Sequence, residues 1–185
     1  LSVLLPQAMV VLITKLRFPL LHDEEFFHLP SILIVRDGLR ESVSLLRLTA
    51  AYKAANGPLP YFIFWVWGSV VGFEPEQLRV VSTMLGMGSV VLFYMLLRSL
   101  RAPQPIVYSW LLVTWPYFFL YSNTLLVHSI YLFFLTGAIL AFHRGLVATR
   151  VNALWLFAGI VSAALALATR QTSLPIVCAL AVHLI

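Results

Sequence analysis

The chain has 185 residues, of which 61% are hydrophobic and only 10% are charged, and its formal net charge is +5. A soluble domain carries about 25% charged residues, so this chain has too few polar groups to cover its surface in water. Composition therefore predicts a polytopic, all-α membrane protein. The basic residues form no block of the kind that binds nucleic acid, and the single cysteine, Cys178, offers no internal disulfide.

The chain begins and stops inside apolar stretches, and we expect it to be a single transmembrane domain, 1–185, cut from a longer protein. Residues 1–21 are predicted to be the end of a first membrane helix, and residues 22–60 an outer loop. Five of the seven acidic residues lie between Asp23 and Glu41, and Asp23-Glu24-Glu25 comes directly after the first helix. Carboxylates at a membrane edge lose favourable solvation free energy, so this cluster indicates a functional role.

Apolar residues recur in the outer loop at spacings of three and four, namely Ile32, Val35, Leu39, Val43 and Leu46. This spacing predicts an amphipathic helix that lies flat on the membrane surface. The turn residues Asn56-Gly57-Pro58 end it. The apolar stretch 61–73 is too short to span a bilayer and is predicted to be interfacial or re-entrant.

Membrane spans are predicted over 80–97, 105–121, 125–142 and 152–169, with a truncated one over 173–185. Short loops on one side then contain Arg98, Arg101, Arg144 and Arg150, and the positive-inside rule makes that side cytoplasmic. The acidic cluster, residues 122–128 and the pair Arg170-Gln171 fall on the other side. These groups come from different helices, and we expect them to converge on one extracytoplasmic cavity.

A set of this kind is what sugar transfer from a lipid phosphate requires. A carboxylate takes the proton from the attacking hydroxyl. A cation such as Arg170 stabilises the departing phosphate through its bidentate fork. Aromatic surface such as Trp65 and Trp67 would hold the apolar tail.

The run Asp23-Glu24-Glu25-Phe26-Phe27-His28-Leu29-Pro30 resembles, with one extra residue, the D-E-x-F-H-x-P signature of a known enzyme family. That family is the dolichyl-phosphate-glucose-dependent α-1,2-glucosyltransferases, in the GT-C superfamily of membrane glycosyltransferases. Two further stretches are similar to family motifs, Pro116-Tyr117-Phe118-Phe119 and Arg170-Gln171-Thr172. His128 stands where the family tends to have glutamate.

The resemblance implies a bundle of the GT-C type that moves a hexose, with glucose as the first expectation, from a polyprenyl or dolichyl phosphate with inversion. The acceptor would be a hydroxyl of a lipid-linked glycan or a similar molecule. Asp23 would be the general base and Glu24 would orient the acceptor or the base. Substrate-binding roles are expected for His28, His128, Arg170 and Gln171.

No cofactor is expected. Asp23, Glu24 and His128 could in principle hold a divalent metal ion, but their spacing is not sharp enough to indicate a metal site. The implied membrane is the endoplasmic reticulum in a eukaryote and the plasma membrane in a prokaryote, with a lumenal or extracytoplasmic site. Membrane lipids are the other expected partners.

Several alternatives stay open at this stage. Within the enzyme class they are other GT-C transferases, acting on mannose, aminoarabinose or protein hydroxyls. Outside it they are a lipid or solute transporter and a non-catalytic membrane subunit. For single residues, His128 is more often a buried, hydrogen-bonded histidine than an acid, a base or a ligand. Arg170 is equally read as an anchor at a helix end.

Overall fold

The structure, a computed structural model, describes residues 4–5, 8–9, 13, 19–21, 23–40, 56–147, 152–170 and 174–175. Every secondary-structure element in these ranges is a helix, so the all-helical prediction is confirmed for them. The elements in chain order are η2 (Glu24–His28), α2 (Leu29–Arg40), α4 (Leu59–Val71), α5 (Pro75–Ser99), α6 (Pro105–Thr114), α7 (Pro116–Ser122), α8 (His128–Val147) and α9 (Ala153–Thr169). Most residues of the predicted spans 1–21 and 173–185 lie outside the described residues.

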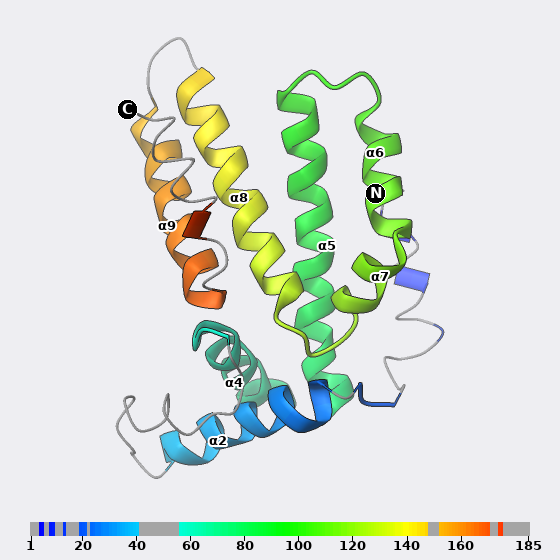
Figure 1. Cartoon of the computed structure of the whole chain (residues 1–185), viewed down its shortest axis with the longest axis vertical. Coiled ribbons are helices and arrows are strands. Elements are labelled where there is room, and N and C mark those ends of the chain that lie inside the picture. Colours follow the sequence, from blue (N-terminus) through cyan, green and yellow to red (C-terminus); the bar gives the residue numbers. More distant parts are fainter. Residues whose placement is uncertain are drawn as a thin grey trace.

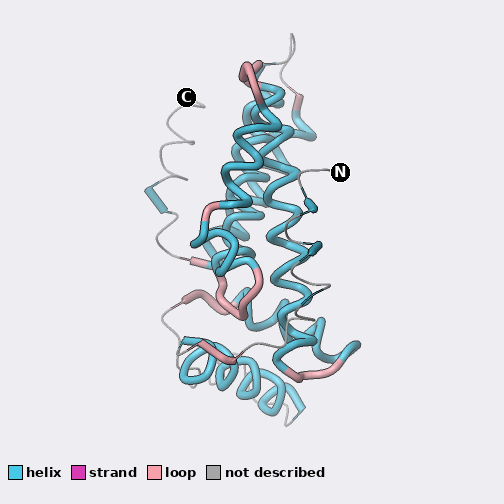
Figure 2. The backbone as a smooth tube through the Cα atoms, turned by 90° about the vertical axis from the view of Figure 1, so that its right-hand side faces the viewer, coloured by secondary structure: helices cyan, strands magenta, loops and turns pink. Residues whose placement is uncertain are grey.

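The helices α5, α8 and α9 run side by side along the long axis of the molecule, and α6 lies next to α5 (Figure 1). The helix α2 crosses their lower end, and α4 lies at that end too (Figures 1 and 2). Two of the described helices are long and apolar enough to cross a membrane, Pro75–Ser99 and His128–Leu146. The apolar helices α4, α6 and α9 are shorter.

Local sequence explains where the long helices begin. Pro75 starts α5, and Glu74 and Gln77 form a reciprocal capping box in which the Glu74 N–H donates to Gln77 Oε1 at 3.2 Å. The side chain of Asn152 caps α9 by accepting from the N–H groups of Leu154 and Trp155. These caps satisfy amide groups that have no partner within their own helix.

The predicted span 105–121 is divided into α6 and α7 at Trp115, whose backbone is extended (ψ 121°). The following residue is Pro116, which lacks an N–H and disfavours the helical conformation of the residue before it. The predicted span 125–142 also differs, because α8 begins only at His128. Residues 123–127 before it form a buried loop.

The amphipathic helix α2 uses its apolar stripe differently from the prediction. Ile32 and Val35 are buried in one core cluster with Tyr61 and Phe64 of α4, so protein covers the part of the stripe that was predicted to face lipid. The predicted stripe residues Val43 and Leu46 lie outside the described ranges. The cluster is completed by residues of α5, α8 and the loop before it: Leu78, Val81, Leu125 and Ile130.

Small residues let α8 and α9 approach each other closely. Ala138 of α8 and Ala163 of α9 are buried with Phe142 in one cluster. A Cβ atom on Gly159 would lie 2.9 Å from the Phe142 ring. Close packing through small residues is typical of helices that pair within a bilayer.

Candidate functional site

The acidic motif forms a π-helical turn that separates its side chains into two sets. Glu24 and His28 are buried, whereas Asp23, Glu25 and the two phenylalanines between Glu25 and His28 are exposed. Single π-helical turns are rare and occur frequently at functional sites. The turn therefore assigns the neighbouring carboxylates Asp23 and Glu24 to different environments.

Glu24 forms a buried ion pair with Arg79, near the start of α5. Arg79 Nη2 donates to Glu24 Oε2 at 2.8 Å and Arg79 Nε donates to Oε1 at 3.1 Å, and the side chains are 1% and 0% exposed. The carboxylate also accepts from the N–H of Leu21 at 2.8 Å and from the N–H of Leu125 at 2.6 Å. Such a paired and hydrogen-bonded carboxylate meets the condition under which a charge can be buried.

Sequence reasoning did not foresee Arg79. Its signal was an isolated arginine at the start of an otherwise apolar helix, because an ionisable residue in such a segment nearly always has a partner. Arg79 also donates to the carbonyl of Pro19 at 3.2 Å. The pair thus joins the chain before Asp23 to α5.

His28 lies on the buried side of the same turn. Its Nδ1 and the hydroxyl of Tyr61 in α4 share a hydrogen bond of 3.2 Å, and the two rings are stacked. Burial lowers the pKa of His28 from its usual value to about 4, although the negative charge of Asp23 opposes this effect. His28 is therefore neutral at neutral pH, and its ring ties η2 to α4.

The loop before α8 is held to α5 by polar contacts. The Thr83 hydroxyl donates to Asn123 Oδ1 at 3.1 Å, and Asn123 Nδ2 donates to the Phe119 carbonyl at 2.7 Å. A Cβ atom on Gly86 would lie 2.6 Å from that of Ser122, so glycine permits the close approach. This packing fixes the position of His128 at the start of α8.

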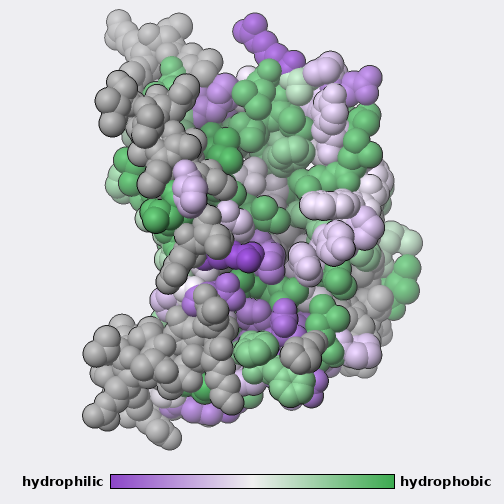
Figure 3. All heavy atoms as spheres, in the orientation of Figure 1, coloured by the Kyte–Doolittle hydropathy of each residue, from purple (hydrophilic) through white to green (hydrophobic). Residues whose placement is uncertain are grey.

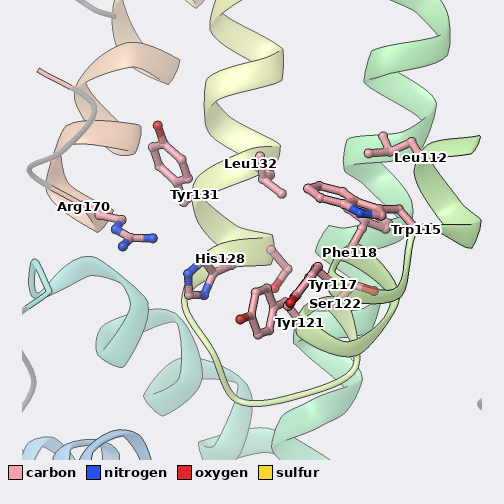
Figure 4. Close-up of a pocket in the computed structure, with 11 residues that line it drawn as sticks. Leu112, Trp115, Tyr117, Phe118, Tyr121, Ser122, His128, Tyr131, Leu132 and Arg170 are labelled. Atoms are coloured by element: carbon pink, nitrogen blue, oxygen red, sulfur yellow. The ribbon is translucent and has the colours of Figure 1, made fainter. Parts of the chain in front are cut away.

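A cavity of about 330 Å³ opens between α7 and the start of α8 (Figure 4). His128, Tyr131 and Leu132 line it from α8, Tyr117, Tyr121 and Phe118 line it from α7, and Arg170 lines it from the end of α9. Apart from Arg170 and a few hydroxyl and ring nitrogen groups, its lining is apolar. An apolar cavity with a few converging polar groups is the usual form of a small-molecule site.

Aromatic rings form a continuous series along this cavity. Trp115 and Tyr117 meet edge to face with centroids 5.9 Å apart, and Tyr117 lies 6.0 Å from Tyr121. Tyr121 stacks on His128 at 4.7 Å. Both Trp115 and Tyr117 are more than half exposed, so the series runs from the surface to His128.

Arg170 reaches the same place from α9. Its side chain points from the end of that helix toward His128 (Figure 4). The helix ends there because the backbone of Arg170 is extended. Gly57 supports this end, because its N–H donates to the Thr169 carbonyl at 3.1 Å.

The structure brings together Asp23, His28, His128 and Arg170. The charge of Asp23 lies close enough to act on both His28 and His128, and the charge of Arg170 lies close enough to act on His128. Figure 3 shows hydrophilic side chains gathered where the lower ends of α8 and α9 meet α2 and α4, below a largely apolar surface. Gln171 lies outside the described residues, so its predicted role remains a prediction.

Among the described residues, no three His, Cys, Asp or Glu side chains are placed to hold one metal ion. Comparison with protein-family models, with curated proteins and with solved structures found no match to this chain. Function is therefore inferred from the chemistry of the site itself.

Proposed function

We propose that this chain is the catalytic part of a membrane glycosyltransferase that moves a hexose from a polyprenyl phosphate to a hydroxyl of a glycan or lipid acceptor. One observation carries the proposal. His128 and Arg170 line the same apolar, aromatic cavity. The exposed carboxylate of Asp23 lies close enough for its charge to act on His128. Base, phosphate partner and apolar groove are the parts that such a transfer needs.

In the proposed reaction, Asp23 accepts the proton of the acceptor hydroxyl while the oxygen of that hydroxyl attacks the anomeric carbon of the sugar. The bond between that carbon and the phosphate oxygen breaks, and polyprenyl phosphate departs with the electron pair. Attack from the face opposite the leaving group inverts the anomeric centre. Arg170 stabilises the charge that develops on the departing phosphate.

The cavity suits a donor that is apolar along most of its length and polar at one end. The exposed aromatic rings of Trp115 and Tyr117 offer apolar area at its mouth, and Arg170 and His128 are its polar end. Tyrosine and histidine faces also stack on sugar rings through their C–H groups. The donor would then lie with its phosphate at Arg170 and its sugar toward Asp23.

Glu24 has a different part in this scheme from Asp23. Its oxygens accept from Arg79 and from backbone N–H groups on both sides, and its side chain is buried. A carboxylate in that state is better suited to hold the base in place than to meet a substrate. The proposal therefore keeps Asp23 as the base and gives Glu24 a supporting role.

The proposal places the chain in a membrane with several crossings. Its support is the apolar length of α5 and α8 and the arginines at or just after the C-terminal ends of these helices, namely Arg98, Arg101 and Arg144, whereas His128 begins α8 at its other end. By the positive-inside rule, those arginines face the cytosol and the site faces away from it. This corresponds to the lumen of the endoplasmic reticulum or to the outside of a plasma membrane.

Radiolabelled polyprenyl-phosphate sugars provide the direct test. Membranes that carry the full chain would be incubated with a panel of glucosyl, mannosyl and aminoarabinosyl donors, and label would be measured in glycan and lipid fractions. Transfer from one donor, absent in membranes without the chain, is the expected result. If no donor is turned over while the labelled donor crosses the membrane, the chain is a transporter and the proposal is wrong.

A further inference from the structure

We infer that the ion pair of Glu24 and Arg79 positions Asp23 relative to His128 and is not itself part of the reacting set. Its effect on turnover rests on the transferase function proposed above. Its effect on geometry does not, because the contacts that carry it are present in the chain whatever reaction the site performs.

The geometry of the pair fixes the orientation of the Glu24 carboxylate as well as its distance from Arg79. Arg79 presents Nε and Nη2 to the two oxygens of Glu24, at 3.1 and 2.8 Å. A planar fork that binds both carboxylate oxygens restricts rotation of each partner, which a single ammonium contact would not do. Because both side chains are at most 1% exposed, water does not compete for these bonds.

The Glu24 carboxylate also joins the two chain segments that lead to Asp23 and to His128. Its Oε2 accepts from Leu21, two residues before Asp23, and its Oε1 accepts from Leu125, three residues before His128. Asp23 is the immediate neighbour of Glu24 in the chain. One side chain therefore sets the separation between the proposed base and the loop that leads to His128.

The two sides of this junction are held to α5 by different contacts. Thr83 of α5 donates to Asn123 in the loop before His128, and Ser122 at the end of α7 packs closely on Gly86; neither contact involves Glu24. The segment before Asp23 meets α5 through Arg79, which donates to the Pro19 carbonyl. Loss of the pair should therefore displace the Asp23 side while the His128 side stays in place.

Pulsed electron paramagnetic resonance can measure this displacement without any activity. Spin labels would be attached to cysteines at Glu25 and at Leu120 of α7, both exposed, after Cys178 is replaced by serine. A second pair of labels, at Val91 of α5 and Leu146 of α8, reports on the bundle far from the site. Both pairs would be measured in the parent and in the Glu24→Gln and Arg79→Lys chains.

We expect Glu24→Gln and Arg79→Lys to broaden the 25–120 distance distribution and to leave the 91–146 distribution unchanged. The matched control is Ser89→Ala, which removes a buried hydroxyl of α5 that bonds to the Leu85 carbonyl, away from Glu24. That variant should change neither distribution.

Kinetics of sugar transfer separate positioning from reaction. Misplacement of a catalytic group by about 1 Å can cost about 100-fold in rate. We therefore expect kcat to fall about 10- to 100-fold in both Glu24→Gln and Arg79→Lys, with the donor KM within about threefold of wild type. If Glu24 itself reacted, Arg79→Lys would keep the carboxylate and most of kcat.

Each outcome decides the inference. A 25–120 distribution that stays narrow in both variants overturns it, and so does a broadened one with wild-type kcat. If every variant broadens both label pairs, the ion pair is a general stabiliser and the positioning role is wrong. If wild type transfers no sugar at all, the transferase proposal fails, and the distance distributions still decide whether the pair sets the geometry.

Discussion

The N–H of Gly57 donates to the carbonyl of Thr169, so the turn before α4 holds the end of α9 one residue before Arg170. A Cβ atom at Gly57 would clash with the carbonyl oxygen of Ala168. A rigid backbone cannot yield as a side chain can, so we predict that Gly57→Ala destabilises the protein by about 1–3 kcal/mol. Thermal unfolding in detergent measures this loss.

Because the displaced backbone carries Arg170, the same substitution should raise the donor KM. Gly137→Ala is the matched control, since a Cβ atom there would meet its nearest neighbour, Leu92 Cδ1, at an ordinary 3.6 Å. That variant should unfold at or above the wild-type temperature, because alanine favours a helix over glycine by about 1 kcal/mol. Equal behaviour of the two variants would refute the role assigned to Gly57.

Asp23→Asn should abolish sugar transfer while the protein still inserts and folds. Asparagine keeps the shape of aspartate but cannot accept the proton of the acceptor hydroxyl, and loss of a general base typically costs about 10²- to 10⁴-fold in rate. The control is Glu25→Gln, which removes an exposed carboxylate from the same turn. Transfer of labelled sugar by the two variants is compared at equal protein, and near-normal turnover by Asp23→Asn would exclude this residue as the base.

Arg170→Ala should weaken the use of lipid-phosphate donors. Hydrogen bonds to charged groups contribute about 1.5–3 kcal/mol, so kcat/KM for the donor should fall about 10- to 100-fold. Arg170→Lys should recover part of this loss, because it keeps the charge without the fork. Arg98→Ala, an exposed arginine at the far end of α5, should leave the same ratio unchanged. Wild-type kcat/KM in Arg170→Ala would contradict the phosphate role.

The sequence predicted the helical class and the residues that converge near His128 because both depend on local signals. Apolar length predicts helices, and alternation of apolar segments with polar ends predicts that Asp23 and Arg170 lie at one end of the bundle. The break at Trp115 could also have been read from Pro116, whose effect on the preceding residue is local. What was missed there was a local rule rather than a long-range contact.

The pairing of Glu24 with Arg79 could not be predicted in the same way. The partners are 55 residues apart, and the N–H of Leu125 that completes the arrangement is 101 residues from Glu24. The π-helical turn mattered as well, because it buries Glu24 and His28 together and leaves Asp23 exposed. Neighbouring carboxylates look equivalent in a sequence, and only the tertiary partners distinguish them.

The buried ion pair should show strong coupling in unfolding experiments. Arg79→Met leaves the Glu24 carboxylate buried without its partner, which typically costs about 3–5 kcal/mol. Adding Glu24→Gln removes that uncompensated charge, so the double variant should be more stable than Arg79→Met alone. A double-mutant cycle in detergent measures the coupling, and simple addition of the two single effects would show that the pair is not coupled in the folded protein.

Stability should also depend on pH through His28. Its pKa is lowered by burial to about 4 in the folded protein, against about 6.5 when the chain is unfolded. Between these values the unfolded state binds more protons, so stability is complete above about pH 6.5 and is lost as pH falls toward 4. The full difference corresponds to about 3 kcal/mol.

The pH effect is isolated by comparing wild type with His28→Gln, because the titrating carboxylates are common to both. The variant loses the stacked contact with Tyr61 and should unfold earlier at pH 7. It should then lose less stability than wild type between pH 6.5 and 4.5, so that the two unfolding curves approach each other in acid. If the stabilities of wild type and His28→Gln depended on pH in parallel, His28 would take up its proton equally in the folded and unfolded states. The description of His28 as a buried, neutral imidazole between η2 and α4 would then be wrong.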